Sequence, residues 1–187
     1  VDEVLIVVKY LGDQIGDYLI KNQHSNCKII KQSNLSGTAG ALWSAKKFLK
    51  TGKKFLVLNG DDIYDRSELQ ILTDRSISMG VARCLLPGPN FFTIDLDGDG
   101  NIMGYRSPTE AESKSEIIVA TGAYVLDDRI FKYKPVVMSN GECGLPQTIF
   151  KMASDYKVKA VFMKKWLPVN TPENLKEAEE KLKHGGV

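Results

Sequence analysis

The sequence is poor in the residues that build disulfide frameworks, zinc sites and histidine-dependent active sites. Its three cysteines, Cys27, Cys84 and Cys143, are odd in number and widely spaced, which argues against a disulfide framework and against a zinc site. We predict that they are free thiols in a reducing cytoplasm. The two histidines, His24 and His184, lie in polar segments, so catalysis by histidine is not expected.

Long apolar runs and a strong net charge are also missing. No apolar run approaches the roughly 20 residues that a membrane-spanning helix needs, and the first residues lack the features of a signal peptide. A net charge of +2 makes no case for nucleic-acid binding. With 187 residues, of which 43% are apolar and 26% charged, we predict one domain over residues 1–187 with no membrane or nucleic-acid partner.

Short apolar runs alternate with helical patterns in the first third of the chain. Strands are predicted over residues 4–8, 28–31 and 55–58, and helices over about 13–21 and 37–49. This alternation indicates βαβ units and hence a parallel sheet. The run Phe55–Leu58 has no polar interruption, so we expect a strand that is buried on both faces.

The pattern changes after a further helix near residues 67–74. Two β-like stretches at 91–94 and 102–105 flank an acidic loop, and strands at 117–126 and 158–163 and helices at 146–154 and 172–183 follow. Thr171 before Pro172 is typical of a helix start. No repeat, low-complexity tract or linker interrupts the chain. We therefore predict a mixed α/β fold.

A pair of carboxylates follows the apolar run that ends at Leu58. Asp61 and Asp62 come directly after Gly60, at a strand end of the kind where ligands bind in open α/β sheets. A buried strand has little reason to end in paired acids unless that end faces a cation, so Asp61 is a candidate metal ligand. Asp62, together with Tyr64 and Asp65, is expected to cap and solvate the next helix.

The segment Asp95–Ile102 (DLDGDGNI) resembles a calcium-binding loop. Acids at its first, third and fifth positions and glycine at its sixth match an EF-hand. The twelfth position, which should be a bidentate Glu, is Arg106, and the flanks are predicted to be strands rather than helices. We therefore favour a tight hairpin turn over a calcium site.

Two polar segments could serve either a ligand or local structure. The Gln32 amide follows a predicted strand and could pair with a nucleobase edge through one donor and one acceptor, while Gly37 would let the backbone approach a flat ring. Gly-Thr at a helix start is also ordinary capping, so both readings stay open. Asn170 begins a good capping sequence, although its amide oxygen could serve a hard cation if it faced Asp61.

Five segments together resemble, in order, the motifs of the sugar-1-phosphate nucleotidyltransferases. They are Gln32–Ala41 (QSNLSGTAGA), Leu58–Asp61 (LNGD), Thr121–Val125 (TGAYV), Gly141–Glu142 with Leu145, and Trp166–Glu173 (WLPVNTPE). The resemblance runs from Val1 to about Lys183. It implies a Rossmann-like α/β fold, with a mixed, mainly parallel sheet flanked by helices.

The resemblance also implies an activity: transfer of a nucleoside monophosphate from an NTP to a sugar 1-phosphate, with release of pyrophosphate. The implied partners are the NTP and the sugar 1-phosphate, and a homo-oligomer is one option for assembly. On the family pattern, Gln32, Gly37 and Thr38 hold the base. Asn59, Gly122 and Glu142 lie near the sugar, and the catalytic Asp61 binds Mg²⁺.

The second metal ligand departs from the commonest family pattern. That ligand is often an Asp two residues after the motif's Trp166, where this chain has Pro168. The N-acetylglucosamine-1-phosphate uridylyltransferases instead use an Asn, which aligns with Asn170. The resemblance therefore implies a Mg²⁺ site made by Asp61 and Asn170.

Two family segments have no match in the chain. A Glu-Lys-Pro segment should fall near 104–108, where the chain has Gly-Tyr-Arg-Ser-Pro, so the sugar stays open. No Gly-x-Gly-Thr-Arg loop is present either. We therefore expect an amino-terminally truncated chain that lacks the family's first strand and phosphate-binding loop, through deliberate truncation, proteolysis or a misannotated start. Alone, it is expected to be inactive or nearly so.

Three other functions remain as alternatives. The missing sugar-contact segment leaves room for a cytidylyltransferase that acts on a polyol or choline phosphate. Pro168 and the absent loop are also compatible with a non-catalytic nucleotide-sensing or scaffold protein. A metal-dependent glycosyltransferase ranks lowest, because the strand end reads Asp61-Asp62-Ile63 rather than Asp-x-Asp.

Overall fold

A computed structural model describes residues 3–32, 35–85 and 92–183 of the chain. The fold divides into two compact units. Unit 1 comprises Val1–Lys53 and Ile130–Ile149, and unit 2 comprises Lys54–Arg129 and Phe150–Val187. Each unit is built from segments that are far apart in the sequence.

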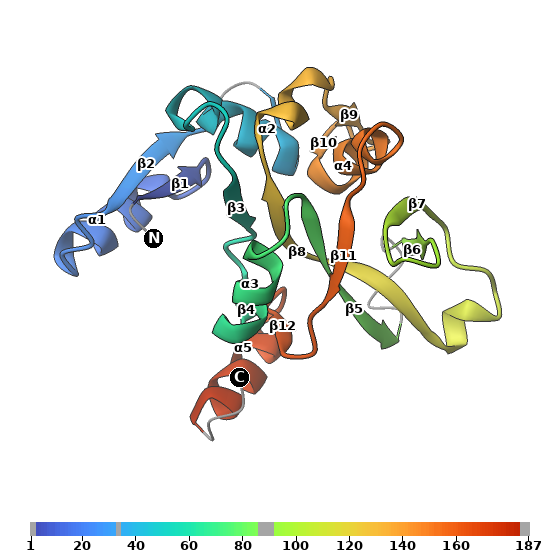
Figure 1. The fold of residues 1–187 in the computed structure, drawn as a ribbon. Coiled ribbons are helices and arrows are strands. Elements are labelled where there is room, and N and C mark those ends of the chain that lie inside the picture. Colours follow the sequence, from blue (N-terminus) through green and yellow to red (C-terminus); the bar gives the residue numbers. More distant parts are fainter. Residues whose placement is uncertain (1–2, 33–34, 86–91, 184–187) are drawn as a thin grey trace. The chain divides into compact units, whose positions relative to one another are not determined.

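Unit 1 begins with a parallel strand pair, as the sequence predicts. Strand β1 (Val4–Val8) pairs with β2 (Cys27–Lys31), and helix α1 (Gly12–Lys21) connects them (Figure 1). The remaining elements that begin in unit 1 are α2 (Gly37–Ala45), the 3-10 turn η1 (Lys46–Phe48), the antiparallel pair β9 (Val136–Val137) and β10 (Cys143–Gly144), and α4 (Leu145–Ala153). The predicted βαβ unit is confirmed.

Helix α2 is short and packs tightly. Ala39, Gly40, Leu42 and Ala45 are buried, so small side chains let the helix approach its neighbours closely. The helix continues as η1 rather than as regular α-helix, and Gly52 follows with a left-handed φ of 69°. The predicted helical segment is thus confirmed, with a tightened last turn.

The core of unit 2 is a four-stranded sheet in the order β11-β5-β8-β3. Its strands are β3 (Phe55–Leu58), β5 (Ser78–Leu85), β8 (Glu116–Leu126) and β11 (Lys159–Phe162). The long strand β8 runs between β3 and β5 (Figure 1) and is antiparallel to both, whereas β11 is parallel to β5. Among all seven described strand pairs, β1–β2 and β11–β5 are parallel and five are antiparallel. The sheets are mixed, as expected, but parallel pairs do not predominate.

Strand β3 is not buried on both faces, and that prediction was wrong. It lies at the end of the strand order and pairs with β8 alone among the described strands. Leu56 and Leu58 are 37% and 40% exposed. The apolar run correctly predicts a strand, but burial depends on which elements cover its faces, and a local sequence pattern does not report these.

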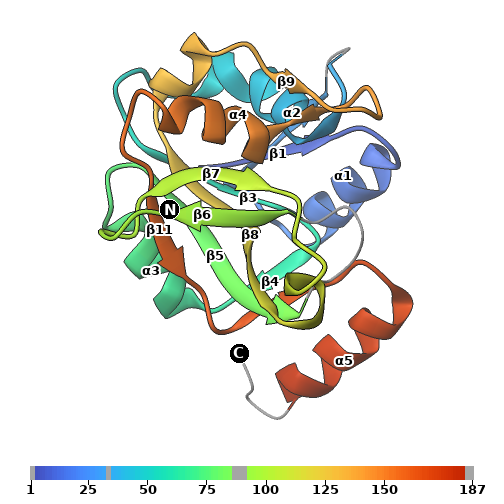
Figure 2. The ribbon, with the colours of Figure 1, turned by 90° about the vertical axis from the view of Figure 1, so that its right-hand side faces the viewer.

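The acidic loop at Asp95–Ile102 forms a hairpin turn, which the sequence predicted in preference to a calcium site. It joins the antiparallel strands β6 (Thr93–Leu96) and β7 (Ile102–Arg106), which lie side by side (Figure 2). The Asp97 carboxylate accepts hydrogen bonds from the backbone N–H groups of Asp99 and Asn101, at 2.9 and 2.8 Å. The carboxylate is thus used to close the turn.

Unit 2 also contains a two-stranded ribbon that the sequence did not reveal. Strand β4 (Asp62–Tyr64) pairs antiparallel with β12 (Trp166–Pro168). The other elements that begin in unit 2 are α3 (Arg66–Thr73), the 3-10 turns η2 (Glu112–Lys114) and η3 (Asp128–Lys132), and α5 (Pro172–Lys183). None of the helices in the described ranges is long and apolar enough to cross a membrane.

Helix α3 begins at a capping aspartate. The Asp65 carboxylate accepts hydrogen bonds from the Ser67 hydroxyl group and from the backbone N–H groups of Ser67 and Glu68, the last two at 2.9 and 3.1 Å. These bonds, that from the hydroxyl group most of all, hold its pKa below the usual range. The predicted capping role of Asp65 is confirmed. Asp62 and Tyr64, which were grouped with it, lie instead in β4.

Candidate functional site

The residues predicted to hold the base gather at the start of α2 in unit 1. Gly37 has a left-handed φ of 78°. A Cβ atom at this position would lie 2.5 Å from the carbonyl oxygen of Cys143 and 3.0 Å from Cβ of Glu142. Only glycine therefore fits this approach of α2 to β10 without strain. Glu142, which was assigned to the sugar, lies beside the base residues.

The Gln32 side chain organises the loop that leads into α2. Its amide nitrogen donates to the carbonyl oxygens of Leu35 and Gly37, at 2.9 and 3.0 Å. With both amide protons used, the oxygen Oε1 is the atom left to meet a ligand. The paired donor–acceptor contact proposed for Gln32 would require these loop contacts to break.

Thr38 connects the start of α2 to the start of α4. Its hydroxyl oxygen accepts the backbone N–H of Leu145 at 2.9 Å, and the residue is otherwise exposed. The hydroxyl proton can still be donated to a ligand. Thus Gln32, Gly37, Thr38 and Glu142 form one cluster in unit 1.

A second cluster in unit 2 contains Asn59 and Gly122. The backbone N–H of Asn59 donates to the carbonyl oxygen of Gly122 at 3.0 Å. Gly122 has a left-handed φ of 77°, and a Cβ atom there would lie 2.3 Å from Nδ2 of Asn59 and 2.8 Å from Oδ2 of Asp62. Glycine therefore leaves room for both side chains.

The ribbon β4–β12 brings Asp61 near Asn170. Pro168 lies opposite Asp62, and the N–H of Val169 donates to the carbonyl oxygen of Asp61 at 2.9 Å. Asn170 follows directly, and both candidate ligands are exposed. Within the described residues, neither the Asp61 carboxylate nor the Asn170 amide group forms a side-chain hydrogen bond or ion pair.

These two side chains suit a hard divalent cation but make a sparse site. Carboxylate and amide oxygens are the donors that Mg²⁺ accepts, and it usually keeps several waters and substrate phosphates as further ligands. Over the part of the chain that the structure describes, no group of three or more His, Cys, Asp or Glu could hold a metal ion. The residues therefore fit a cation whose remaining ligands come from substrate and water.

Asp62 differs from Asp61 because it is half-buried. Burial, with a smaller contribution from the nearby Asp61 charge, raises the pKa of Asp62 from 3.8 to about 6, although hydrogen bonds from Tyr64, Asn59 and Trp166 act to lower it. The Tyr64 hydroxyl lies 3.1 Å from its Oδ2. The Trp166 indole nitrogen is buried and reaches no partner at hydrogen-bond geometry within the described residues, so it is the weaker donor.

The raised pKa of Asp62 predicts that the contribution of this group to stability falls as pH rises from about 4 to about 7. Over this range, the native carboxyl group keeps a proton that the unfolded chain has lost, so the linked stability disappears as pH passes about 6. Since the side chain is only half-buried, solvent screening limits the loss to about 1–2 kcal/mol. Urea unfolding of metal-free protein should show this slope, and Asp62→Asn should remove it. A constant difference between the two proteins over this pH range would contradict the prediction.

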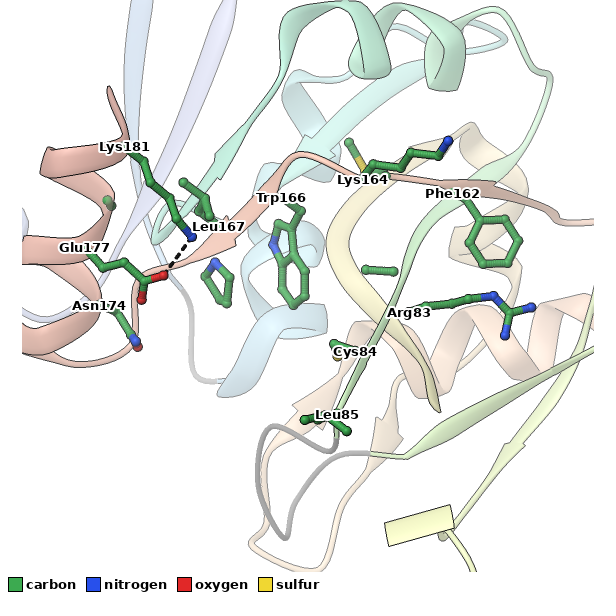
Figure 3. Close-up of a pocket in the computed structure, with 14 residues that line it drawn as sticks. Arg83, Cys84, Leu85, Phe162, Lys164, Trp166, Leu167, Asn174, Glu177 and Lys181 are labelled. Atoms are coloured by element: carbon green, nitrogen blue, oxygen red, sulfur yellow. Dashed lines mark hydrogen bonds and ion pairs between the residues drawn. The ribbon is translucent and has the colours of Figure 1, made fainter. Parts of the chain in front are cut away.

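None of the predicted site residues lines a pocket in unit 2 that contains part of the Trp166 motif. It has a volume of about 790 Å³ and opens between β5, β12 and α5 (Figure 3). Arg83, Cys84 and Leu85 line it from β5, while Trp166 and Leu167 line it from β12 (Figure 3). Trp166 thus contributes to this pocket and to the surroundings of Asp62.

Comparison with protein families agrees with the motifs. Residues 1–85 match the model of a family described as nucleotidyl transferase. The chain is 31% identical over 185 residues to the bifunctional protein GlmU of Methanocaldococcus jannaschii, covering 97% of this chain and 43% of that protein. Identity to the GlmU of Methanococcus vannielii is 28% over 167 residues, covering 86% of this chain and 39% of that protein. The chain spans less than half the length of these relatives.

Solved structures share the fold. A UDP-glucose pyrophosphorylase complexed with UDP-glucose superimposes with a TM-score of 0.80 at 17% identity, covering 98% of this chain and 81% of that one. The inositol-1-phosphate CTP transferase from T. maritima gives 0.75 at 16% identity, covering 100% and 79%. These similarities confirm the predicted fold class. The family match over residues 1–85 and the GlmU relatives agree with the resemblance to the sugar-1-phosphate nucleotidyltransferases that the motifs show.

Proposed function

We propose that the protein transfers a nucleoside monophosphate from an NTP to a sugar 1-phosphate. A phosphate oxygen of the sugar 1-phosphate bonds to the α-phosphorus of the NTP, the bond from that phosphorus to the bridging oxygen breaks, and pyrophosphate leaves. The attacking oxygen is already anionic at neutral pH, so no histidine base is needed. Positioning and charge neutralisation supply the catalysis.

The observation that carries this proposal is the grouping of the motif residues in each unit. In unit 1, Oε1 of Gln32, the backbone at Gly37 and the hydroxyl group of Thr38 offer polar contacts to a nucleobase. In unit 2, Asn59 and Gly122 are held together by a 3.0 Å backbone hydrogen bond and would contact the sugar. Within each unit, candidate residues that are far apart in the sequence lie close together, which supports the proposal.

The proposal includes Mg²⁺ as the metal, held by Asp61 and Asn170. When bound, the ion would neutralise charge that develops on the phosphates. The exposed Asp61 carboxylate is free of side-chain partners among the described residues, which leaves it available. The amide oxygen of Asn170, on the chain that leaves β12, would be the second protein ligand.

We further propose that the group gripping the triphosphate comes from chain outside these 187 residues. Two strands support this idea. Each is apolar along its whole length, and each pairs on one side only within the described residues: β1 with β2, and β3 with β8. The edge of a sheet offers backbone N–H and C=O groups to which a further strand can pair. A further strand from outside these residues would be followed by a loop, and that loop could bind the triphosphate.

Pyrophosphate release provides the test. The 187-residue chain and a form extended at its amino terminus would be incubated with the four common NTPs, Mg²⁺ and a panel of sugar 1-phosphates. We expect the extended form to release pyrophosphate with at least one pair, and the shorter chain to be at least about a hundredfold slower.

The same assay separates the competing functions. Turnover with CTP and a polyol or choline phosphate, but with no sugar 1-phosphate, would favour the cytidylyltransferase; the shared fold with an inositol-1-phosphate CTP transferase gives a reason to include these acceptors. Binding of an NTP without pyrophosphate release from any acceptor would support a nucleotide-sensing role and contradict the enzyme.

A further inference from the structure

The half-buried carboxylate of Asp62 has no role in the reaction as proposed above. It lies in β4, next to the candidate ligand Asp61 but turned differently. Asp61 lies in the turn before β4 and is exposed, whereas Asp62 is half-buried beside Tyr64. Asp62 is therefore poorly placed to share a cation with Asp61.

The atoms around Asp62 belong to the proposed sugar contact. Oδ2 of Asp62 and Nδ2 of Asn59 both border the space above Gly122, at 2.8 and 2.3 Å from where a Cβ atom would lie. The Asn59 side chain is one of the donors that favour the charged form of Asp62 and so oppose the rise in its pKa. A carboxylate only accepts hydrogen bonds, so the amide group that faces it must present its nitrogen.

The hydroxyl group of Tyr64 links β4 to β8 by a hydrogen bond. It donates to the carbonyl oxygen of Thr121 at 2.8 Å and lies 3.1 Å from Oδ2 of Asp62. Thr121 precedes Gly122, whose left-handed backbone leaves room for the Asn59 amide. Strand β4 is thus tied to β8 next to the point where Asn59 meets Gly122.

We propose that Asp62 and Tyr64 are positioning residues that hold the Asn59 side chain with its nitrogen inward and its oxygen toward the sugar. Asn59 then acts as a hydrogen-bond acceptor, so the site selects a sugar 1-phosphate with a hydroxyl group, a donor, at the facing position. This inference rests on the proposed function for the identity of the ligand. The orientation of the Asn59 side chain does not depend on the proposed function.

The orientation can be tested on the 187-residue chain by NMR. The Asn59 side-chain NH₂ signals, assigned by their loss in Asn59→Asp, should exchange slowly with water. Asp62→Leu removes the acceptor and should speed this exchange about tenfold or more, whereas Asp62→Asn keeps an acceptor oxygen and should retain part of the protection. Asp74→Leu, at an exposed position in the same unit, is the matched control. Equal exchange in Asp62→Leu and Asp74→Leu, with both folded, would overturn the proposal.

The substrate consequence is tested in the form of the protein that turns over. Asp62→Leu and Tyr64→Phe should raise KM for the sugar 1-phosphate about tenfold, with little change in KM for the NTP, and Asp62→Asn should restore part of the loss. Monodeoxy sugar 1-phosphates should identify one hydroxyl group that matters to Asn59. Its removal should raise KM of the wild-type protein but should no longer raise KM of Asp62→Leu.

Each outcome has a separate meaning. If both KM values rise together, or only kcat falls, Asp62 does not position a sugar contact. If no acceptor is turned over, the proposed function fails and the sugar contact fails with it. The NMR result then still decides whether Asp62 holds Asn59.

Discussion

Replacing Gly37 by alanine should lower the free energy of unfolding by about 2–4 kcal/mol. The left-handed backbone at this position costs a residue with a Cβ atom about 1–2 kcal/mol. The added carbon would also lie 2.5 Å from the Cys143 carbonyl oxygen, and backbone cannot move aside as a flexible side chain can, which adds about 1–2 kcal/mol. Urea unfolding followed by circular dichroism would measure the loss.

Two other glycines allow the contributions to be separated. Gly52 has a similar φ of 69° but open space around it, so Gly52→Ala should cost only the conformational part, about 1 kcal/mol. Gly98 has neither a left-handed φ nor a neighbour within 4 Å, so Gly98→Ala should be close to neutral. If Gly37→Ala costs no more than Gly52→Ala, the close packing of α2 on β10 is refuted.

Replacing Asp61 by asparagine should abolish most metal-dependent turnover while the fold stays intact. The exposed Asp61 carboxylate makes no side-chain hydrogen bond or ion pair in the described part of the chain, so its loss should hardly change stability. If it holds the cation, loss of its charge removes transition-state stabilisation, and kcat/KM should fall at least about a hundredfold. The measurement is pyrophosphate release against Mg²⁺ concentration, in the form of the protein that turns over.

The control for Asp61→Asn is the same change at Asp74, an exposed acid in the same unit. Asp74→Asn should leave the rate and its Mg²⁺ dependence unchanged. Asp61→Glu keeps the charge but moves it by one methylene group, so it should retain part of the activity at raised Mg²⁺. Full activity of Asp61→Asn at low Mg²⁺ would show that Asp61 is not a ligand.

Most of the local structure could be predicted because the patterns are local. The run VLIVV forms β1, and the Pro172 start of α5 lies where the helix signal placed it. The hairpin at Asp97 was predicted over a calcium site because Arg106 stands where a glutamate ligand belongs. In each case, residues close together in the sequence decide the outcome.

Strands β4, β5 and β12 were not predicted, for two different reasons. Strands β4 and β12 have three residues each and lie about a hundred positions apart, so neither has a detectable period. The central strand β5 was missed because Gly80 and Arg83 interrupt its apolar pattern. Gly80 is required there, since a Cβ atom would lie 2.5 Å from both the Met163 sulfur and the Thr121 hydroxyl oxygen.

The candidate site was predicted unevenly for the same reason. The order of the motifs pointed to Gln32, Asn59 and Asp61 as candidate site residues. In the fold, the candidates of each unit lie near one another. The surroundings of Asp62 were missed, because burial and contact with Tyr64 arise from tertiary packing. One signal was present: an acid and a tyrosine two residues apart in an extended segment share one side of the strand.

The pairing of β3 with β8 alone among the described strands has a practical consequence for the protein in solution. Unpaired backbone along an apolar strand is a template for strands of other molecules, and native sheets usually protect such edges with charge or proline. Leu56 and Leu58 offer neither. Preparations limited to these 187 residues are therefore expected to self-associate as concentration rises. Lysine at Leu58 should reduce the association, making this edge the first place to engineer for soluble material.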